Sequence, residues 1–177
     1  MEQLDDFLLY KGTSIRVNFT SNGIRFFTQV PSEARSKLIN GTLLDGNLAG
    51  YKLVEYGTVF AWADKGYATT ANGTSYAYLA GKRDSVFSRG DGSLLYTGML
   101  TDLGSDKDTL KRDLLARPYF VMERKNADGT TDSVTLYGGQ IQRSIYYVAC
   151  QNRDYWAAGS AYDNYIESII ATAEGKS

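Results

Sequence analysis

The residue types that could carry chemistry are unevenly represented in this 177-residue chain. It contains 14 tyrosines, seven phenylalanines and two tryptophans, but no histidine and a single cysteine. Without histidine it lacks the usual general base near neutral pH and the commonest metal ligand. Tyrosine suits contact with a partner surface, because its ring is apolar while its hydroxyl stays hydrated. The composition therefore favours a binding or structural module over an enzyme.

Six aromatic residues lie at a predicted strand end or in polar and loop segments, where a ligand could reach them. They are Trp62, Tyr67, Tyr76, Tyr78, Tyr155 and Trp156. Tyr76 and Tyr78 would share one face of an extended segment, and Tyr155 and Trp156 fall between two predicted helices. Sugars stack their C–H faces on such rings, so we predict a ligand platform. Ordinary core packing is the alternative, and it requires many of these rings to be buried.

Four charged residues could form a polar pocket for an acidic sugar or a structural network. They are Arg25, Glu55, Arg117 and Arg143. A partly buried arginine needs hydrogen-bonding or ionic partners, so we favour the structural network, which would connect strands to a late helix.

Aspartates gather after the segment around Tyr96, and three of them are a candidate calcium site. The three are Asp102, Asp106 and Asp108, with Asp113 close by. Calcium prefers several oxygen ligands, but this spacing is not that of an EF-hand loop. Helix capping by Ser105 or Asp106 explains part of the cluster without a metal. We expect no other cofactor.

Catalysis without histidine would need paired carboxylates, as in glycoside hydrolysis. Glu55 and Asp64 are the best pair in the sequence, but a regular strand would place them on opposite faces. Ser144 lacks the glycine-framed turn of a nucleophile elbow. We therefore assign no catalytic residue and expect the protein not to be an enzyme.

The overall composition limits the possible partners. The net charge is −1 and the basic residues are scattered, so we expect no nucleic-acid partner. The chain has no apolar run long enough to span a bilayer and no signal peptide pattern. We interpret Cys150, inside an apolar run, as a small buried hydrophobic residue. The length fits one domain over residues 1–177, with a frayed tail at 174–177.

Alternating apolar residues between glycine and asparagine turns predict an antiparallel sheet system. The predicted strands are 14–19, 23–30, 52–63, 93–101, 116–125 and 133–137. The segment 126–130 (NADGT) is a hairpin signal between the last two.

Helical periodicity and end signals predict a smaller helical part. The predicted helices are 32–39, 106–115, 140–152 and 161–173. We therefore predict a mainly-β fold, with an antiparallel β-sandwich-like core and accessory helices, two of them C-terminal. An α+β layer with helices on one face is the alternative.

Five segments spread along the chain carry a family resemblance. They are 22–26 (NGIRF), 54–59 (VEYGTV), 95–98 (LYTG), 116–121 (ARPYFV) and 143–149 (RSIYYVA). In this order they resemble a β-rich domain of secreted and surface multidomain proteins of Gram-positive gut Clostridia. The chain departs from that pattern at Pro118, where glycine is more usual, and at Trp62, where the family often continues into a Pro-Ala-Asp-like stretch. That family has no established activity, so the resemblance implies an extracellular, noncatalytic module of a larger protein.

Taken together, these features predict a noncatalytic binding module at the cell surface or outside the cell. Its partner would be a glycan held by exposed aromatic rings, and it would be part of a longer multidomain protein. The alternative is a structural, adhesion or protein-docking module of a surface or virion protein. That alternative predicts no affinity for sugars.

Overall fold

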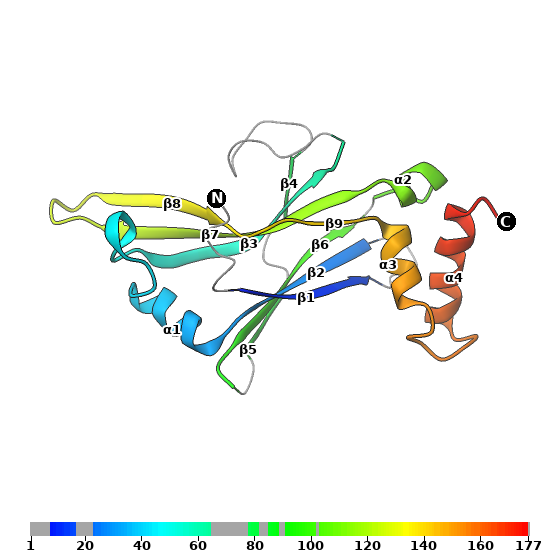
Figure 1. The fold of residues 1–177 in the computed structure, drawn as a ribbon, viewed down its shortest axis with the longest axis horizontal. Coiled ribbons are helices and arrows are strands. Elements are labelled where there is room, and N and C mark those ends of the chain that lie inside the picture. The colour runs from blue at the N-terminus through cyan, green and yellow to red at the C-terminus, as the bar shows by residue number, and fades with distance from the viewer. Residues whose placement is uncertain are drawn as a thin grey trace.

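Two antiparallel sheets form the centre of the protein (Figure 1). The computed structural model describes residues 8–16, 23–64, 78–81, 85–88, 91–101 and 103–176. The first sheet has the order β1-β2-β6-β5, with β1 (Leu9–Ile15), β2 (Gly23–Val30), β5 (Ser85–Ser88) and β6 (Leu94–Thr101). The second has the order β4-β3-β7-β8, with β3 (Lys52–Trp62), β4 (Tyr78–Gly81), β7 (Leu114–Lys125) and β8 (Thr131–Tyr137); β9 (Ile141–Arg143) also pairs with β7.

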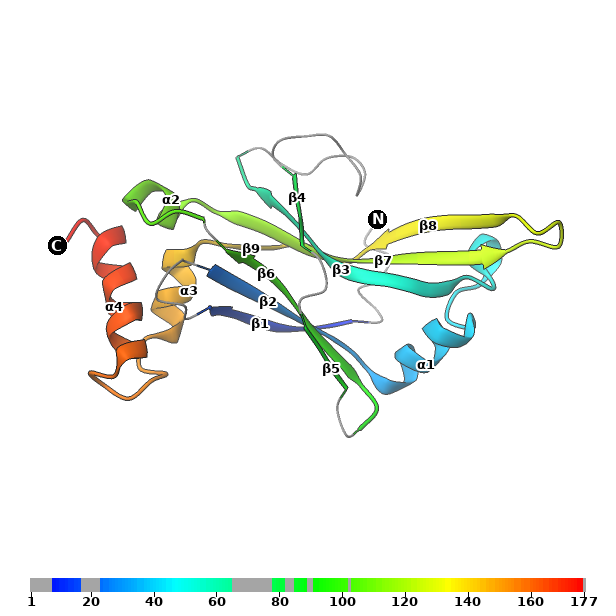
Figure 2. The same cartoon turned by 180° about the vertical axis from the view of Figure 1, so that it is seen from behind.

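The helices lie at the two ends of the sheets (Figures 1 and 2). At one end are α1 (Ser32–Asn40) and the short 3-10 helix η2 (Gly46–Leu48). At the other end are α2 (Lys107–Lys111), α3 (Ile145–Asn152) and α4 (Ala161–Ala173). The predicted mainly-β fold with accessory helices, two of them C-terminal, is confirmed. Within the described part of the chain, no helix is both long and apolar enough to cross a bilayer.

The core has two parts, one toward each helical end. Near α3 and α4, Phe26 and Phe60 meet edge to face between the sheets at 5.5 Å, beside Ile145 and Ile166. Near α1, the buried residues include Leu38, Tyr96, Phe120, Met122 and Leu136. Burying these side chains supplies the main favourable free energy of folding. Burial along the central strands does not strictly alternate, since residues 57–61 of β3 are all buried, as are residues 114–116 of β7.

Most predicted elements form where the sequence places them, and two helices are shorter than predicted for the same reason. The helix predicted over 106–115 ends at Lys111, and Leu114 and Leu115 begin β7 instead. The helix predicted from Gln140 begins at Ile145, because the preceding residues pair with the start of β7. In both cases backbone hydrogen bonds to a distant strand replace a local helix. Only the first two residues of the strand predicted over 14–19 belong to β1, and positions 17–19 lie outside the described residues.

Candidate functional site

Three aromatic rings contact one another at the loop between α3 and α4. Tyr155 and Trp156 have ring centroids 5.2 Å apart at 82°, and Trp156 and Tyr162 lie 4.7 Å apart at 36°. They are exposed by 75% (Tyr155), 36% (Trp156) and 42% (Tyr162). We call Tyr155, Trp156 and Tyr162 the aromatic cluster. Two of its members were predicted as ligand residues. The third, Tyr162, was not predicted, although its place in the first turn of α4, directly after the loop, could have indicated it.

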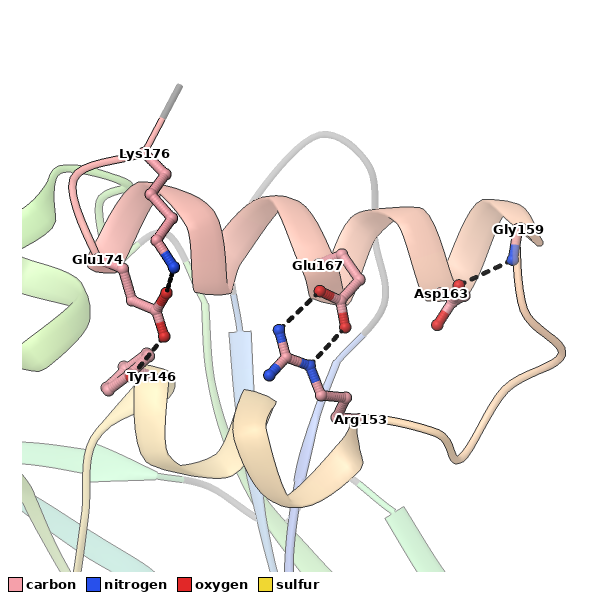
Figure 3. A network of polar contacts seen from close by, with 7 residues as sticks. All are labelled: Tyr146, Arg153, Gly159, Asp163, Glu167, Glu174 and Lys176. Carbon is pink, nitrogen blue, oxygen red and sulfur yellow. Dashed lines mark hydrogen bonds and ion pairs between the residues drawn. The ribbon is translucent and has the colours of Figure 1, made fainter.

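The start of α4 holds one side of this loop in place (Figure 3). The Ser160 hydroxyl caps the helix by accepting a hydrogen bond from the Asp163 N–H at 3.2 Å. The Asp163 carboxylate in turn accepts one from the Gly159 N–H at 2.8 Å. This reciprocal arrangement resembles a capping box and satisfies N–H groups that a helix start leaves unpaired. The ring of Tyr162 is therefore carried by a fixed helical turn.

Two polar contacts join α3 and its C-terminal end to α4 (Figure 3). The Arg153 guanidinium donates to both carboxylate oxygens of Glu167, at 2.7 and 2.8 Å. This contact lowers the pKa of Glu167 and raises that of Arg153. Toward the other end of α4, Glu174 accepts hydrogen bonds from Lys176 and Tyr146, and both lower its pKa. The loop between α3 and α4 thus begins at a residue, Arg153, whose side chain is held by the middle of α4.

The other predicted platform residues are placed elsewhere or lie outside the described part. Trp62 ends β3, half-buried against the core, with the Arg112 guanidinium over its ring at 4.2 Å. Arg112 also forms a bidentate ion pair with Asp64, at 2.8 and 3.0 Å. Tyr67 and Tyr76 lie outside the described residues. Tyr78 begins β4, but its side chain is not among those described.

Glu55 and Arg117, two of the four predicted network residues, lie in a row of side chains on one face of the second sheet. Tyr119 donates its hydroxyl hydrogen to Glu55 at 2.6 Å, and Arg117 lies over the Tyr137 ring at 4.0 Å. Tyr119 and Tyr137 are register partners in the β7–β8 hairpin, so the row crosses three strands. Sequence reasoning missed both tyrosines. The alternation along β7 and the hairpin register together could have indicated them.

Arg25 and Arg143 are held in other surroundings. Arg25 lies on β2 between its partners Ser14 and Met99, in the first sheet. Arg143 ends β9, donates to the Gln142 carbonyl at 2.7 Å and lies 5.2 Å from the Tyr147 ring centroid. Of the four predicted network residues, only Glu55 and Arg117 thus share one face of a sheet. The described contacts place Arg25 and Arg143 elsewhere.

The best carboxylate pair of the sequence is widely separated. Glu55 bonds to Tyr119, whereas Asp64 binds Arg112 beyond the end of β3. The strand from Glu55 to Trp62 alone spans about 20 Å at the usual rise per residue. Glycosidase carboxylates lie about 5 to 10 Å apart, so these two cannot act on one bond.

Asp106 serves as the N-cap of α2, as the capping interpretation predicts. Its carboxylate accepts hydrogen bonds from the Thr109 hydroxyl at 2.6 Å and the Thr109 N–H at 3.0 Å, which lower its pKa. Asp113 accepts a hydrogen bond from Gln142. Asp102 lies outside the described residues. Among those described, no three carboxylate, cysteine or histidine side chains gather closely enough to hold a metal ion.

No family model, curated protein or solved structure was found to match the chain.

Proposed function

We propose that this protein is a noncatalytic glycan-binding module that takes its ligand on the aromatic cluster. One observation carries the proposal: three contacting rings remain partly exposed, while the rings of Phe60, Tyr96 and Phe120 are fully buried in the core. Exposed aromatic groups are typical of binding sites, because covering their apolar faces with a ligand is favourable.

The chemistry around the rings suits a hydroxyl-rich ligand. The Tyr155 hydroxyl can donate or accept a hydrogen bond, and the carboxylate of the neighbouring exposed residue Asp154 can accept one. Pyranose rings present an apolar C–H face and polar edges, and the aromatic cluster offers both kinds of contact. Because the capping contacts and the Arg153–Glu167 pair already hold the loop, little ordering free energy would be lost on binding.

The location and context of the module belong to the same proposal. The five segments that resemble a Clostridial surface-protein domain support an extracellular or cell-surface location within a larger multidomain protein. The net charge of −1 supports a partner other than nucleic acid. No cofactor is needed for binding by stacking.

Affinity electrophoresis tests the proposal. The chain would be run through native gels containing starch, xylan, xyloglucan, pectin, β-glucan or mucin, with and without calcium. We expect retardation by at least one polymer and its loss in Trp156→Ala, because truncating a central aromatic contact typically costs more than tenfold in affinity.

Tyr147→Ala is the matched control for this experiment. Tyr147 is also an exposed aromatic residue at 48%, but it contacts Arg143 and Gln151 rather than the aromatic cluster. Its variant should bind like the unchanged protein. Equal retardation of Trp156→Ala and the unchanged protein would contradict the assignment of the site.

A structural, adhesion or protein-docking module is the second candidate function. It is favoured by β8, the last strand in the order of the second sheet, whose outer edge has no strand partner among the described residues. Such an edge can accept a strand from another protein. This candidate predicts no retardation by any polysaccharide, together with self-association or capture of a protein ligand.

A further inference from the structure

A groove of about 420 Å³ lies beside the start of β3 and the end of β7. These strand ends are at the α1 end of the molecule, opposite α3 and α4 (Figure 1). Its lining residues come from the start of β3 and the end of β7, and from the turn before β3. They are Gly50, Lys52, Val54, Glu123, Arg124 and Lys125. This volume is in the usual range of small-ligand sites, about 300 to 1,000 Å³. We call these six residues the basic groove.

The sheet register sets the pattern of charge in the basic groove. Lys52 and Glu123 are register partners of β3 and β7, so their side chains leave the same face of the sheet. Lys125 lies two residues after Glu123 and therefore shares that face. Two ammonium groups thus flank a single carboxylate.

These two lysines differ from the neighbouring arginine in their existing contacts. Arg124 pairs with Asp132 at 3.4 Å, donates to the Ala49 carbonyl at 3.1 Å and lies 4.7 Å from the Tyr51 ring centroid. Its charge is therefore already offset. The ion pairs within the described residues involve neither Lys52 nor Lys125. The groove keeps an excess positive charge after Glu123 is counted.

Glycines bring the backbone close to two of the cationic side chains. Gly41 and Gly50 both have positive φ, at 74° and 81°. A Cβ on Gly41 would lie 3.1 Å from Lys52 Cγ, and one on Gly50 would lie 3.5 Å from Arg124 Cδ. The segment between α1 and β3 thus packs on the aliphatic parts of the Lys52 and Arg124 side chains. This packing limits the conformational freedom of both side chains before any ligand binds.

We propose that the basic groove is a subsite for the carboxylate of a uronic acid in an acidic oligosaccharide. This inference rests on the proposed glycan-binding function and adds a second site and a ligand class. Lys52 and Lys125 would donate charge-assisted hydrogen bonds to the ligand carboxylate. Glu123 would accept hydrogen bonds from sugar hydroxyls, and Val54, exposed by 52%, would contact the apolar face of the ring. A neutral sugar would leave both ammonium groups unpaired.

Isothermal titration calorimetry with a short galacturonic-acid oligosaccharide tests the subsite. The same oligosaccharide with its carboxyls methyl-esterified is the uncharged comparison. We expect the acidic form to bind at least about tenfold more tightly than the ester. The double variant Lys52→Gln/Lys125→Gln should lose about tenfold or more of that affinity, because two charge-assisted contacts are removed.

Two further variants test whether the affinity for the acidic form belongs to the basic groove. Lys11→Gln/Lys107→Gln makes the same charge change at exposed positions on β1 and α2, and it should bind the acidic form like the unchanged protein. Trp156→Ala should also keep this affinity, because the aromatic cluster lies at the other end of the molecule.

The possible results decide between the two proposals. Equal binding of the acid and the ester, no binding of either, or equal losses in the two lysine double variants would each overturn the subsite. Loss in Trp156→Ala together with full binding by Lys52→Gln/Lys125→Gln would overturn the subsite but support the aromatic cluster. Failure of Trp156→Ala to weaken any polysaccharide complex would count against the aromatic cluster alone.

Discussion

The contact between Arg153 and Glu167 links the start of the loop between α3 and α4 to the middle of α4. Both hydrogen bonds are shorter than 3 Å, and the two side chains remain 46% and 42% exposed. At such exposure an ion pair adds little to global stability. Its bidentate geometry nevertheless restricts the position of Arg153, the residue at which the loop leaves α3.

The lowered pKa of Glu167 predicts how this contact responds to acid. The hydrogen bond from Arg153 lowers that pKa below its usual 4.5. A lowered folded-state pKa stabilises the protein above about pH 4.5, and this contribution is lost as the pH falls through the folded value. Glu167→Gln should therefore reduce the free energy of unfolding at pH 7 and make it fall less steeply toward pH 3. Urea denaturation across this pH range measures both effects.

The partner variant provides the control for this prediction. Arg153→Gln removes the same contact from the other side, so it should reduce the acid dependence by a similar amount. The double variant should then add almost nothing to either single change. Strictly additive losses would show that the two side chains stabilise the fold independently.

Among the helices, α4 is the one whose start and length the sequence predicts completely. Ser160 precedes a run whose apolar residues recur at helical spacing, and Ile166, Ile169 and Ile170 are buried as that spacing requires. Local signals suffice here because the cap, the first turn and the buried face all lie within one short segment. The helix predicted over 106–115 is shorter in the structure, because Leu114 and Leu115 pair with β3 and β9 as part of β7.

Ser160→Ala should destabilise the protein by about 1 kcal/mol, because it removes the side-chain cap of α4. Ser168→Ala, in the middle of the same helix, should be neutral or slightly stabilising. Ser168 is exposed and its hydroxyl donates only to the Tyr165 carbonyl, and alanine has the higher helix propensity. Urea denaturation of the two variants measures the difference. A loss at Ser168 as large as that at Ser160 would refute the assigned capping role.

At the scale of the whole molecule, the two sheets approach each other closely where Gly98 of β6 faces Thr58 and Phe60 of β3. A Cβ on Gly98 would lie 2.4 Å from Thr58 Cβ and 3.0 Å from the Phe60 ring. Both Thr58 and Phe60 belong to the buried interior. Glycine at this position therefore determines how closely the sheets can pack.

Gly98→Ala should destabilise the protein by about 1 to 3 kcal/mol or more, because the added methyl group overpacks the space between the sheets. Thr58→Gly opens that space from the opposite strand. The double variant Gly98→Ala/Thr58→Gly should therefore be less destabilised than the sum of its two single changes. Chemical denaturation of all three variants measures this coupling, and additivity would contradict the proposed close approach.

The sequence by itself determined the mainly-β composition, most strand positions, the β7–β8 hairpin and the helix cap at Asp106. These features depend on alternation, turn residues and local hydrogen bonds, which adjacent residues specify. Tertiary structure alone decided which aromatic rings meet. Tyr162 joins Tyr155 and Trp156 across a loop, whereas Trp62 packs beneath Arg112. It also decided where β9 replaces a helix and where lysines gather in a groove, because these depend on pairing between strands distant in the chain.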